Sequence, residues 1–114
     1  NLTGANSFSG GVSLGSGALG VGSNTALGSG QAAVQTGTTL RAVANVTLAN
    51  AIQISQGAFG VNQFTVDTNG FNMTLSGVIS TAVPATEAIQ PGLTKNGLGD
   101  LTLSGVNTYR GQTI

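Results

Sequence analysis

Few side chains in this sequence could catalyse a reaction. The 114 residues include three acidic ones, Asp67, Glu87 and Asp100, and neither histidine nor cysteine. Two carboxylates that face each other across a glycosidic bond, one ionised and one protonated, can hydrolyse a polysaccharide. Asp67 and Asp100 are 33 residues apart, so neighbouring turns of a repetitive fold would bring them close together. Each is explained more simply as a polar residue that faces water at a strand end, and catalysis by this pair is the minor hypothesis.

Two glycine-rich segments are similar to ligand-binding motifs but lack the required context. Residues 15–20 fit G-x-G-x-x-G, which binds a phosphate when a helix opens from it, and the following Val-Gly-Ser-Asn cannot begin a helix. Residues 97–101 are similar to a calcium-binding nonapeptide. Their last glycine directly adjoins Asp100, however, and one copy would leave the ion short of oxygen ligands. Without histidine or cysteine the usual zinc sites are also excluded. We therefore expect no cofactor and no bound metal.

The composition excludes several further classes of protein. Three basic residues balance the three acidic ones, which is too little positive charge for nucleic-acid binding. The absence of cysteine excludes a disulfide scaffold, and no apolar stretch approaches the ~18 residues of a membrane-spanning helix. The first residues show no signal peptide, so we expect either that one was removed or that the chain is an internal piece. Leu, Ile, Val and Phe supply 30 residues, above the ~20% below which disorder is expected.

Short runs in the sequence alternate apolar and polar residues, which is the two-residue period of a β-strand with one buried face. Gly, Asn or Asp follows each run, and the Asn69-Gly70 and Asn96-Gly97 pairs are typical of turns. Residues 84–91 lie between two prolines, and we expect a protruding loop or a single helical turn there. The fold is predicted to be all-β, with strands at Val12–Leu14, Thr39–Val43, Val46–Leu48, Ala51–Ile54, Phe64–Asp67, Met73–Leu75 and Leu101–Leu103.

Internal repetition indicates how the strands are arranged. Residues 73–78 recur as residues 101–106, at an offset of 28, and residues 2–10 recur without a gap as residues 103–111, at an offset of 101. The second match predicts that the chain begins and ends at the same phase of a larger unit. Many short strands without two-residue hairpin turns favour a solenoid. With ~20–25 residues per coil, the chain would form a parallel β-helix of about five coils. A sandwich of antiparallel strands is the alternative.

The final segment, GLTKNGLGDLTLSGVNTYRG at residues 92–111, resembles the autotransporter-associated β-strand repeat. Its lysine, its glycines and its Asn-Thr-Tyr all fall in place, and the match covers almost all of residues 92–113. Residues 2–11 resemble the tail of a preceding copy, with Phe8 where Tyr109 stands. Departures occur at variable positions, Leu98, Asp100, Arg110 and Gln112, and at the insertion between the two prolines.

This resemblance implies a right-handed parallel β-helix in the passenger of a type V secreted protein. The whole chain, residues 1–114, would be one repeat segment: a motif tail at 2–11, inter-motif coils at 12–91 and the main motif at 92–114. The residues expected to matter are structural rather than catalytic. They are Gly92, Leu93, Lys95, Gly97, Gly99, Leu101, Leu103, Gly105, Asn107, Tyr109 and Gly111.

The resemblance also implies a function, which is to act as a structural stalk that aids secretion by vectorial folding and presents a distal module at the bacterial surface. Few charges, no cysteines and small residues suit passage through a narrow outer-membrane pore. The expected partners are neighbouring β-helix repeats of the same or identical chains, with a host-cell or glycan ligand as a further option. An adhesive or fibre-forming module is the alternative, and a polysaccharide-active enzyme is a third hypothesis.

Overall fold

The computed structural model describes residues 1–57, 61–83, 86–87 and 90–114. Within these residues the chain is all-β, and every strand pairing is parallel. The antiparallel sandwich is therefore excluded. None of the described residues belongs to a helix, so they include no helical membrane span. The strands are β1 (Val12–Leu14), β2 (Ala18–Val21), β3 (Ala32–Gln35), β4 (Thr39–Ala42), β5 (Val46–Leu48), β6 (Ile52–Ser55), β7 (Gln63–Asp67), β8 (Met73–Leu75), β9 (Ile79–Thr81), β10 (Gly92–Asn96) and β11 (Leu101–Leu103).

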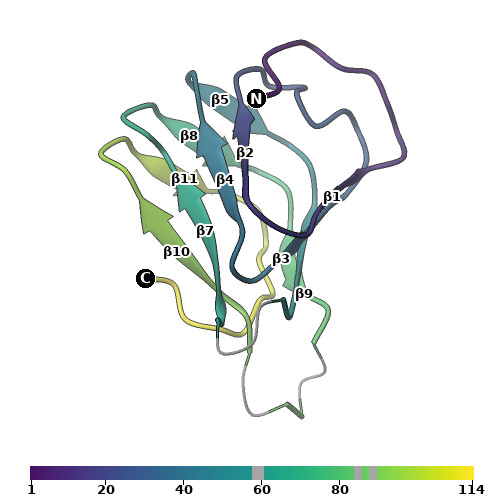
Figure 1. Cartoon of the computed structure of the whole chain (residues 1–114), viewed down its shortest axis with the longest axis vertical. Helices are drawn as coiled ribbons and strands as arrows, with labels where there is room; N and C mark the ends of the chain where they lie inside the picture. Colours follow the sequence, from purple (N-terminus) through teal and green to yellow (C-terminus); the bar gives the residue numbers. More distant parts are fainter. Residues whose placement is uncertain (58–60, 84–85, 88–89) are drawn as a thin grey trace.

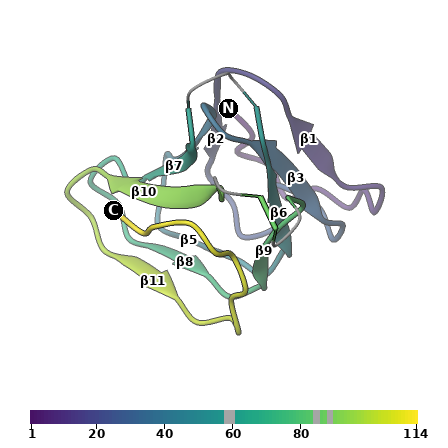
Figure 2. The ribbon, with the colours of Figure 1, turned by 90° about the horizontal axis from the view of Figure 1, so that it is seen from below.

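The strands form three sheets, which we name A, B and C. Sheet A has the order β10-β7-β4-β2, sheet B the order β1-β3-β6-β9, and sheet C the order β11-β8-β5. The chain passes through sheets B, A and C in turn, so each strand pairs with the strand that follows one circuit later. The described residues of the first circuit contribute no strand to sheet C. Figure 1 shows the strands of sheet A stacked side by side, and Figure 2 shows the three sheets on three sides of the molecule.

Sheet A extends by one isolated pairing at each end. Leu2 pairs with Val21 beside β2, and Thr113 pairs with Leu93 beside β10, both in parallel. Six successive levels of described chain therefore lie along this sheet, and five circuits connect them. The circuits differ in length: Val12 pairs with Ala32, and Ala32 with Ile52, whereas Ile52 pairs with Ile79.

The core lies between the three sheets because every second residue of each strand points inward. In β6, Ile52 and Ile54 are buried while Gln53 and Ser55 are half-buried, and β5 and β8 show the same alternation. Parallel register places inward residues of successive circuits against each other, as for Val46, Met73 and Leu101. Phe64, at the centre of sheet A, is fully buried. Since full burial of such a side chain contributes about 1.5–3 kcal/mol, these stacked rows supply the main stabilisation.

The structure confirms all seven strands expected from the alternating runs. Four strands lay outside those runs: β2, β3, β9 and β10. Asn69-Gly70 is in a turn, whereas Asn96 is the last residue of β10 and Gly97 begins the bend that follows it. The φ angle is positive at Asn69, Gly70 and Gly97. Of the segment expected to form a loop or helical turn between the prolines, residues 84–85 and 88–89 lie outside the described residues. Exposed Thr86 and Glu87 are not in a helix.

The two internal repeats have different outcomes. The 28-residue offset equals the length of one circuit, because Met73 and Leu101 are register partners in sheet C. The 101-residue offset is wrong as a guide to phase. Leu2 lies in line with sheet A, whereas its sequence match Leu103 lies in sheet C. The physical reason is that the circuits differ in length, from 19 residues between Leu2 and Val21 to 28 between Met73 and Leu101. A match in sequence therefore does not ensure the same position on the circuit.

Candidate functional site

The glycines of the main repeat motif lie where the backbone of an adjacent circuit comes close. A Cβ atom on Gly99 would overlap the carbonyl of Phe71, and one on Gly105 would overlap the carbonyl of Gly77. Gly92 and Gly111 meet backbone atoms of Gln112 and Pro91 in the same way. Gly97 has a φ of 87°, which a residue with a side chain adopts only under strain. These positions are glycine because the circuits stack backbone to backbone.

The apolar and polar residues of the motif complete the same stack. Leu93 is fully buried, whereas Leu101 and Leu103 are half-buried and pack against the core. The Asn107 side-chain oxygen accepts a hydrogen bond of 2.9 Å from the backbone N–H of Ile79, one circuit earlier. Half-buried Tyr109 packs against the core, and its hydroxyl contacts that of Thr113. The motif thus holds the last circuit onto the one before it.

Lys95 lies in line with an inward row of sheet A. Lys95 is the register partner of fully buried Val66. It therefore continues the row that Leu19, Leu40 and Val66 form in sheet A. Its ammonium donates to the carbonyl oxygen of Gly97 at 2.6 Å. Its aliphatic stem therefore covers apolar surface while the charge turns back to the turn carbonyl.

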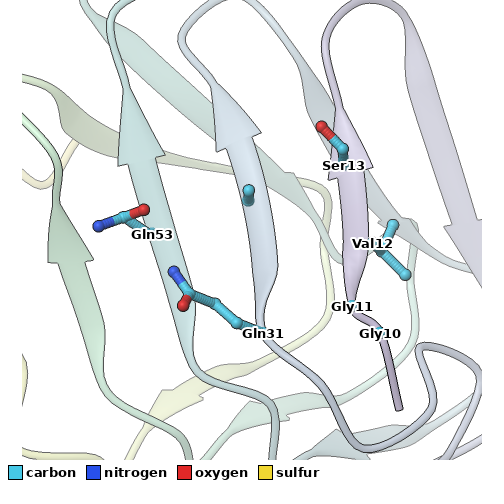
Figure 3. A pocket seen from close by; sticks show the side chains of 7 residues that line it. Gly10, Gly11, Val12, Ser13, Gln31 and Gln53 are labelled. Carbon is cyan, nitrogen blue, oxygen red and sulfur yellow. The ribbon is translucent and has the colours of Figure 1, made fainter. Parts of the chain in front are cut away.

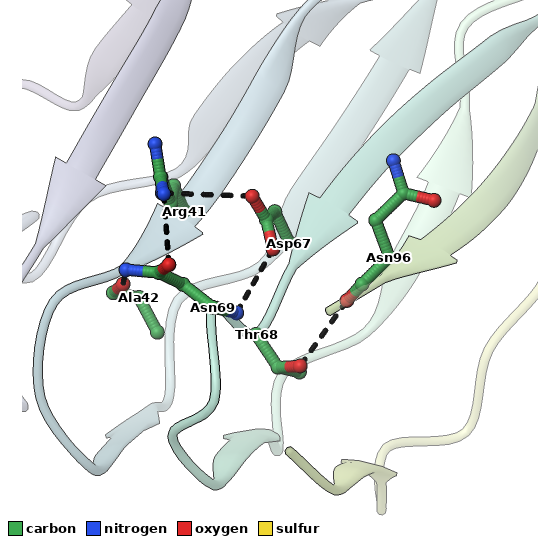
Figure 4. Close-up of polar contacts among 6 residues, drawn as sticks. All are labelled: Arg41, Ala42, Asp67, Thr68, Asn69 and Asn96. Carbon is green, nitrogen blue, oxygen red and sulfur yellow. Dashed lines mark hydrogen bonds and ion pairs between the residues drawn. The ribbon is translucent and has the colours of Figure 1, made fainter. Parts of the chain in front are cut away.

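A polar cluster at the end of sheet A contains the ion pair that the described residues form (Figure 4). Arg41 Nε lies 3.5 Å from Asp67 Oδ2, with the Arg41 side chain 50% exposed, so the pair itself is worth well under about 1 kcal/mol. Arg41 Nη2 also donates to Asn69 Oδ1 at 2.8 Å. The other carboxylate oxygen of Asp67 accepts the backbone N–H of Asn69 at 2.9 Å. Asp67 thus stabilises the turn that contains Asn69.

The corner between sheets A and C is built by side chains that each bond the next circuit. Asn24 Oδ1 accepts the N–H of Thr47 at 2.8 Å, and Asn45 Oδ1 accepts that of Asn72 at 2.9 Å. Asn72 Oδ1 then accepts the N–H of Asp100 at 3.2 Å. Asp100 is therefore the next residue of an asparagine row, and it is exposed. We call Asn24, Asn45, Asn72 and Asp100 the corner row.

Buried polar residues complete the backbone hydrogen bonding inside the corners. Asn50 Nδ2 lies within 2.8–3.4 Å of the carbonyl oxygens of Leu27, Gly28 and Gly30. Thr68, which is fully buried, donates to the carbonyl oxygen of Asn96 at 3.1 Å. Sequence reasoning missed both residues. The only signal for them is a polar residue two positions after an inward apolar one, as Leu48 precedes Asn50 and Val66 precedes Thr68.

A shallow groove of about 320 Å³ crosses the outward face of sheet B (Figure 3). Its apolar lining comes from Gly10, Gly11, Val12 and Ala33, and its polar side chains are Ser13, Gln31 and Gln53. Ser13 and Gln31 are exposed and Gln53 is half-buried. The groove contains no charged side chain and no aromatic ring. Its polar side chains are therefore one hydroxyl and two amides, all uncharged.

The described residues contain no group of three or more His, Cys, Asp or Glu arranged to hold a metal ion. Comparison with protein-family models, curated proteins and solved structures gives no match to the chain. The function is therefore inferred from the geometry of the residues. That geometry brings the motif residues together as contacts between circuits, and it places the acidic residues in a turn, a corner row and an exposed position at Glu87.

The role of the motif glycines is tested by Gly99→Ala. We expect a loss of about 1–3 kcal/mol in unfolding free energy, because the added methyl group overlaps the Phe71 carbonyl and forces the circuits apart. The measurement is urea unfolding followed by far-UV circular dichroism. Gly15→Ala is the matched control. Its Cβ would meet nothing within 4 Å, so its stability should change by no more than about 0.5 kcal/mol. Equal losses in the two variants would contradict the role of close approach.

Proposed function

We propose that the chain is a right-handed parallel β-helix segment of about five coils that acts as a structural stalk. The supporting observation is the pairing pattern: each described strand bonds only to strands one circuit earlier or later in its own sheet. Such a molecule is quasi-one-dimensional, because each circuit contacts only its neighbours. Its length then grows with each circuit at about 4.8 Å, the spacing of hydrogen-bonded strands. A rod of this kind sets a distance between its two ends.

The distribution of chemistry in the structure supports a structural role over catalysis. The two acidic residues first considered for catalysis, Asp67 and Asp100, lie in the turn cluster and in the corner row. The motif residues bond or pack from one circuit to the next, as Asn107 does to Ile79. Outward positions of the sheets carry mostly uncharged polar residues, including the register-matched threonines Thr47, Thr74 and Thr102. These features favour a stacked support over an enzyme.

The setting of this stalk is the passenger of a bacterial autotransporter, by the resemblance of residues 92–113 to the autotransporter-associated β-strand repeat. Stacking circuit by circuit allows folding to begin at one end and propagate, because each circuit needs contacts only with the neighbouring circuit. A chain that emerges from an outer-membrane pore would then fold progressively outside, which biases its movement outward. The absence of cysteine and the small number of charges suit this route. The finished rod would hold a distal module away from the cell.

The stalk function is tested by adding one circuit. Ala32 pairs with Ile52, so a second copy of residues 32–51 placed after residue 51 keeps every later residue in register. We expect the maximum dimension from small-angle X-ray scattering to increase by about 4.8 Å along the stacking axis. A duplication of residues 32–41 alone is the control, because it shifts inward residues into the wrong sheet. An insertion of the full circuit that unfolds the chain, or leaves its length unchanged, would contradict the proposal.

The proposed location is tested on intact cells that produce the parent protein. Antibodies against this segment should label unpermeabilised cells, and brief external protease treatment should remove the label, because the stalk would stand outside the outer membrane. A periplasmic protein followed in parallel controls for cell integrity. Labelling that requires permeabilisation would place the segment inside the cell and remove the stalk from its proposed setting.

A self-associating module is the second candidate, and the last circuit favours it. Leu101 and Leu103 are only half-buried although they belong to core rows, and β11 has a strand on one side only. Asp100 also extends the corner row, in which Asn24, Asn45 and Asn72 each accept an N–H from the next circuit. An exposed strand edge next to apolar residues pairs readily with another chain. A second copy stacked on this end would cover all of these groups.

Sedimentation velocity over a range of concentrations tests this second candidate. The native chain should form larger species as concentration rises, and Leu101→Lys should stay monomeric because it places a charge at the open end. Thr102→Lys is the matched control, since the neighbouring residue faces outward from the same strand. Circular dichroism checks that both variants keep their β structure. A native chain that is monomeric throughout, or association lost equally in both variants, would exclude self-association through this end.

A further inference from the structure

The two Asn-Gly pairs lie near the ends of successive strands of sheet A, at different positions. Asn69 is in the turn two residues after β7, whereas Asn96 is the last residue of β10, and their side chains have different surroundings. We propose that Asn96 is a site of spontaneous deamidation in the folded protein, whereas Asn69 is protected by its hydrogen bonds. The co-reactant is water, and the product is a carboxylate on the surface of sheet A. This inference does not depend on the proposed function, because it follows from the local contacts alone.

The reaction requires the backbone nitrogen of the following residue. The nitrogen of Gly97 attacks the side-chain carbonyl carbon of Asn96, and a new C–N bond closes a five-membered succinimide. The bond from that carbon to Nδ2 breaks, and ammonia leaves with the proton from the Gly97 nitrogen. Water then opens the ring at one of its two carbonyls, which yields aspartate or isoaspartate at position 96. A glycine favours the attack because it has no Cβ to obstruct the approach.

Asn69 is held away from this reaction. Its Oδ1 accepts a hydrogen bond of 2.8 Å from Arg41 Nη2, and its Nδ2 donates to the carbonyl oxygen of Ala42 at 3.2 Å. Both bonds reach the preceding circuit, and Figure 4 shows the side chain directed towards Arg41 and Ala42. Rotation of the Asn69 amide towards the nitrogen of Gly70 would break both bonds. The residue is also partly shielded from water.

Asn96 has no such restraint on its amide. It is exposed, and its side chain makes no hydrogen bond to any described residue. The bonds that do reach Asn96 come from the N–H and hydroxyl of Thr68, at 2.9 and 3.1 Å, and they end on the backbone carbonyl oxygen. In Figure 4 the Asn96 amide points away from the other labelled side chains. The amide is therefore free to rotate towards the Gly97 nitrogen, which donates no hydrogen bond to a described residue.

The products would weaken the attachment of the last circuits. Aspartate at position 96 would lie opposite Asp67, its register partner, and like charges directly opposite each other are destabilising. Isoaspartate would lengthen the backbone by one methylene group at the point where Thr68 bonds the Asn96 carbonyl. The same turn packs Gly97 tightly against Asn69 and Thr68. Deamidation at Asn96 would thus loosen β10 from β7.

The test compares the two sites within one molecule. The native chain and the chain unfolded in guanidinium are incubated at the same mildly alkaline pH and temperature, digested, and measured by mass spectrometry. In the native chain we expect conversion at Asn96 to be at least several-fold faster than at Asn69. In the unfolded chain the two rates should become similar, since both sites then share the Asn-Gly sequence without native contacts. Enzymatic methylation of isoaspartate identifies the second product.

Two variants assign the difference to the contacts. Arg41→Met removes the donor to Asn69 Oδ1 and should raise conversion at Asn69 while leaving Asn96 unchanged. Asn96→Gln should abolish conversion at position 96, because its longer side chain disfavours ring closure, and should leave Asn69 as in the native chain. Circular dichroism confirms that each variant is folded. Equal native rates at the two sites, a faster rate at Asn69, or conversion at neither site in the native chain would each overturn the proposal.

Discussion

Parallel hydrogen bonding between successive circuits is the interaction on which the rest of this structure depends. It ties each residue to one about a full circuit away, as Ile52 is tied to Ile79 and Met73 to Leu101. Because hydrogen-bonded strands lie only about 4.8 Å apart, equivalent residues of neighbouring circuits must fit against each other. Inward rows are therefore apolar, and corners where backbones meet require glycine, as at Gly99 and Gly105. The composition of the chain follows from this spacing.

The corners pose a second requirement, because strand hydrogen bonding stops there while the backbone remains partly buried. A buried backbone group without a partner is destabilising. The corner row supplies side-chain oxygens to the backbone N–H groups of successive circuits, and Asn50 supplies donors to carbonyl oxygens inside the stack. Asparagine suits these positions because its amide both donates and accepts. The high content of asparagine and threonine therefore reflects the corners as well as the outer faces.

The same constraint explains why the polar residues that suggested chemistry are engaged in structure. Asp67 is bonded to Arg41 and to the backbone of Asn69, and Lys95 returns its charge to the Gly97 carbonyl. A molecule held together mainly by its own neighbours in sequence order is suited to extension and stacking, and this supports the proposed stalk. Its outer faces carry mostly uncharged polar residues, which suit contacts with other molecules.

The sequence by itself determined the all-β class, seven of the strands and the 28-residue repeat. Each of these features appears as a local pattern in the sequence, either as alternating apolar and polar residues or as a repeated segment. Strands β2 and β3 were not recognisable because they lack a clear alternation of large apolar and polar residues. β2 contains Gly20, and β3 has the small residue Ala32 at an inward position, whose burial depends on the neighbouring circuits. The position of Lys95 in an inward row, the contacts of Asn50 and the different phases of Leu2 and Leu103 were also hidden. Only the tertiary structure decided these features. The register between two circuits depends on the total length of the strands and corners between the paired residues. No short segment of the sequence specifies that length.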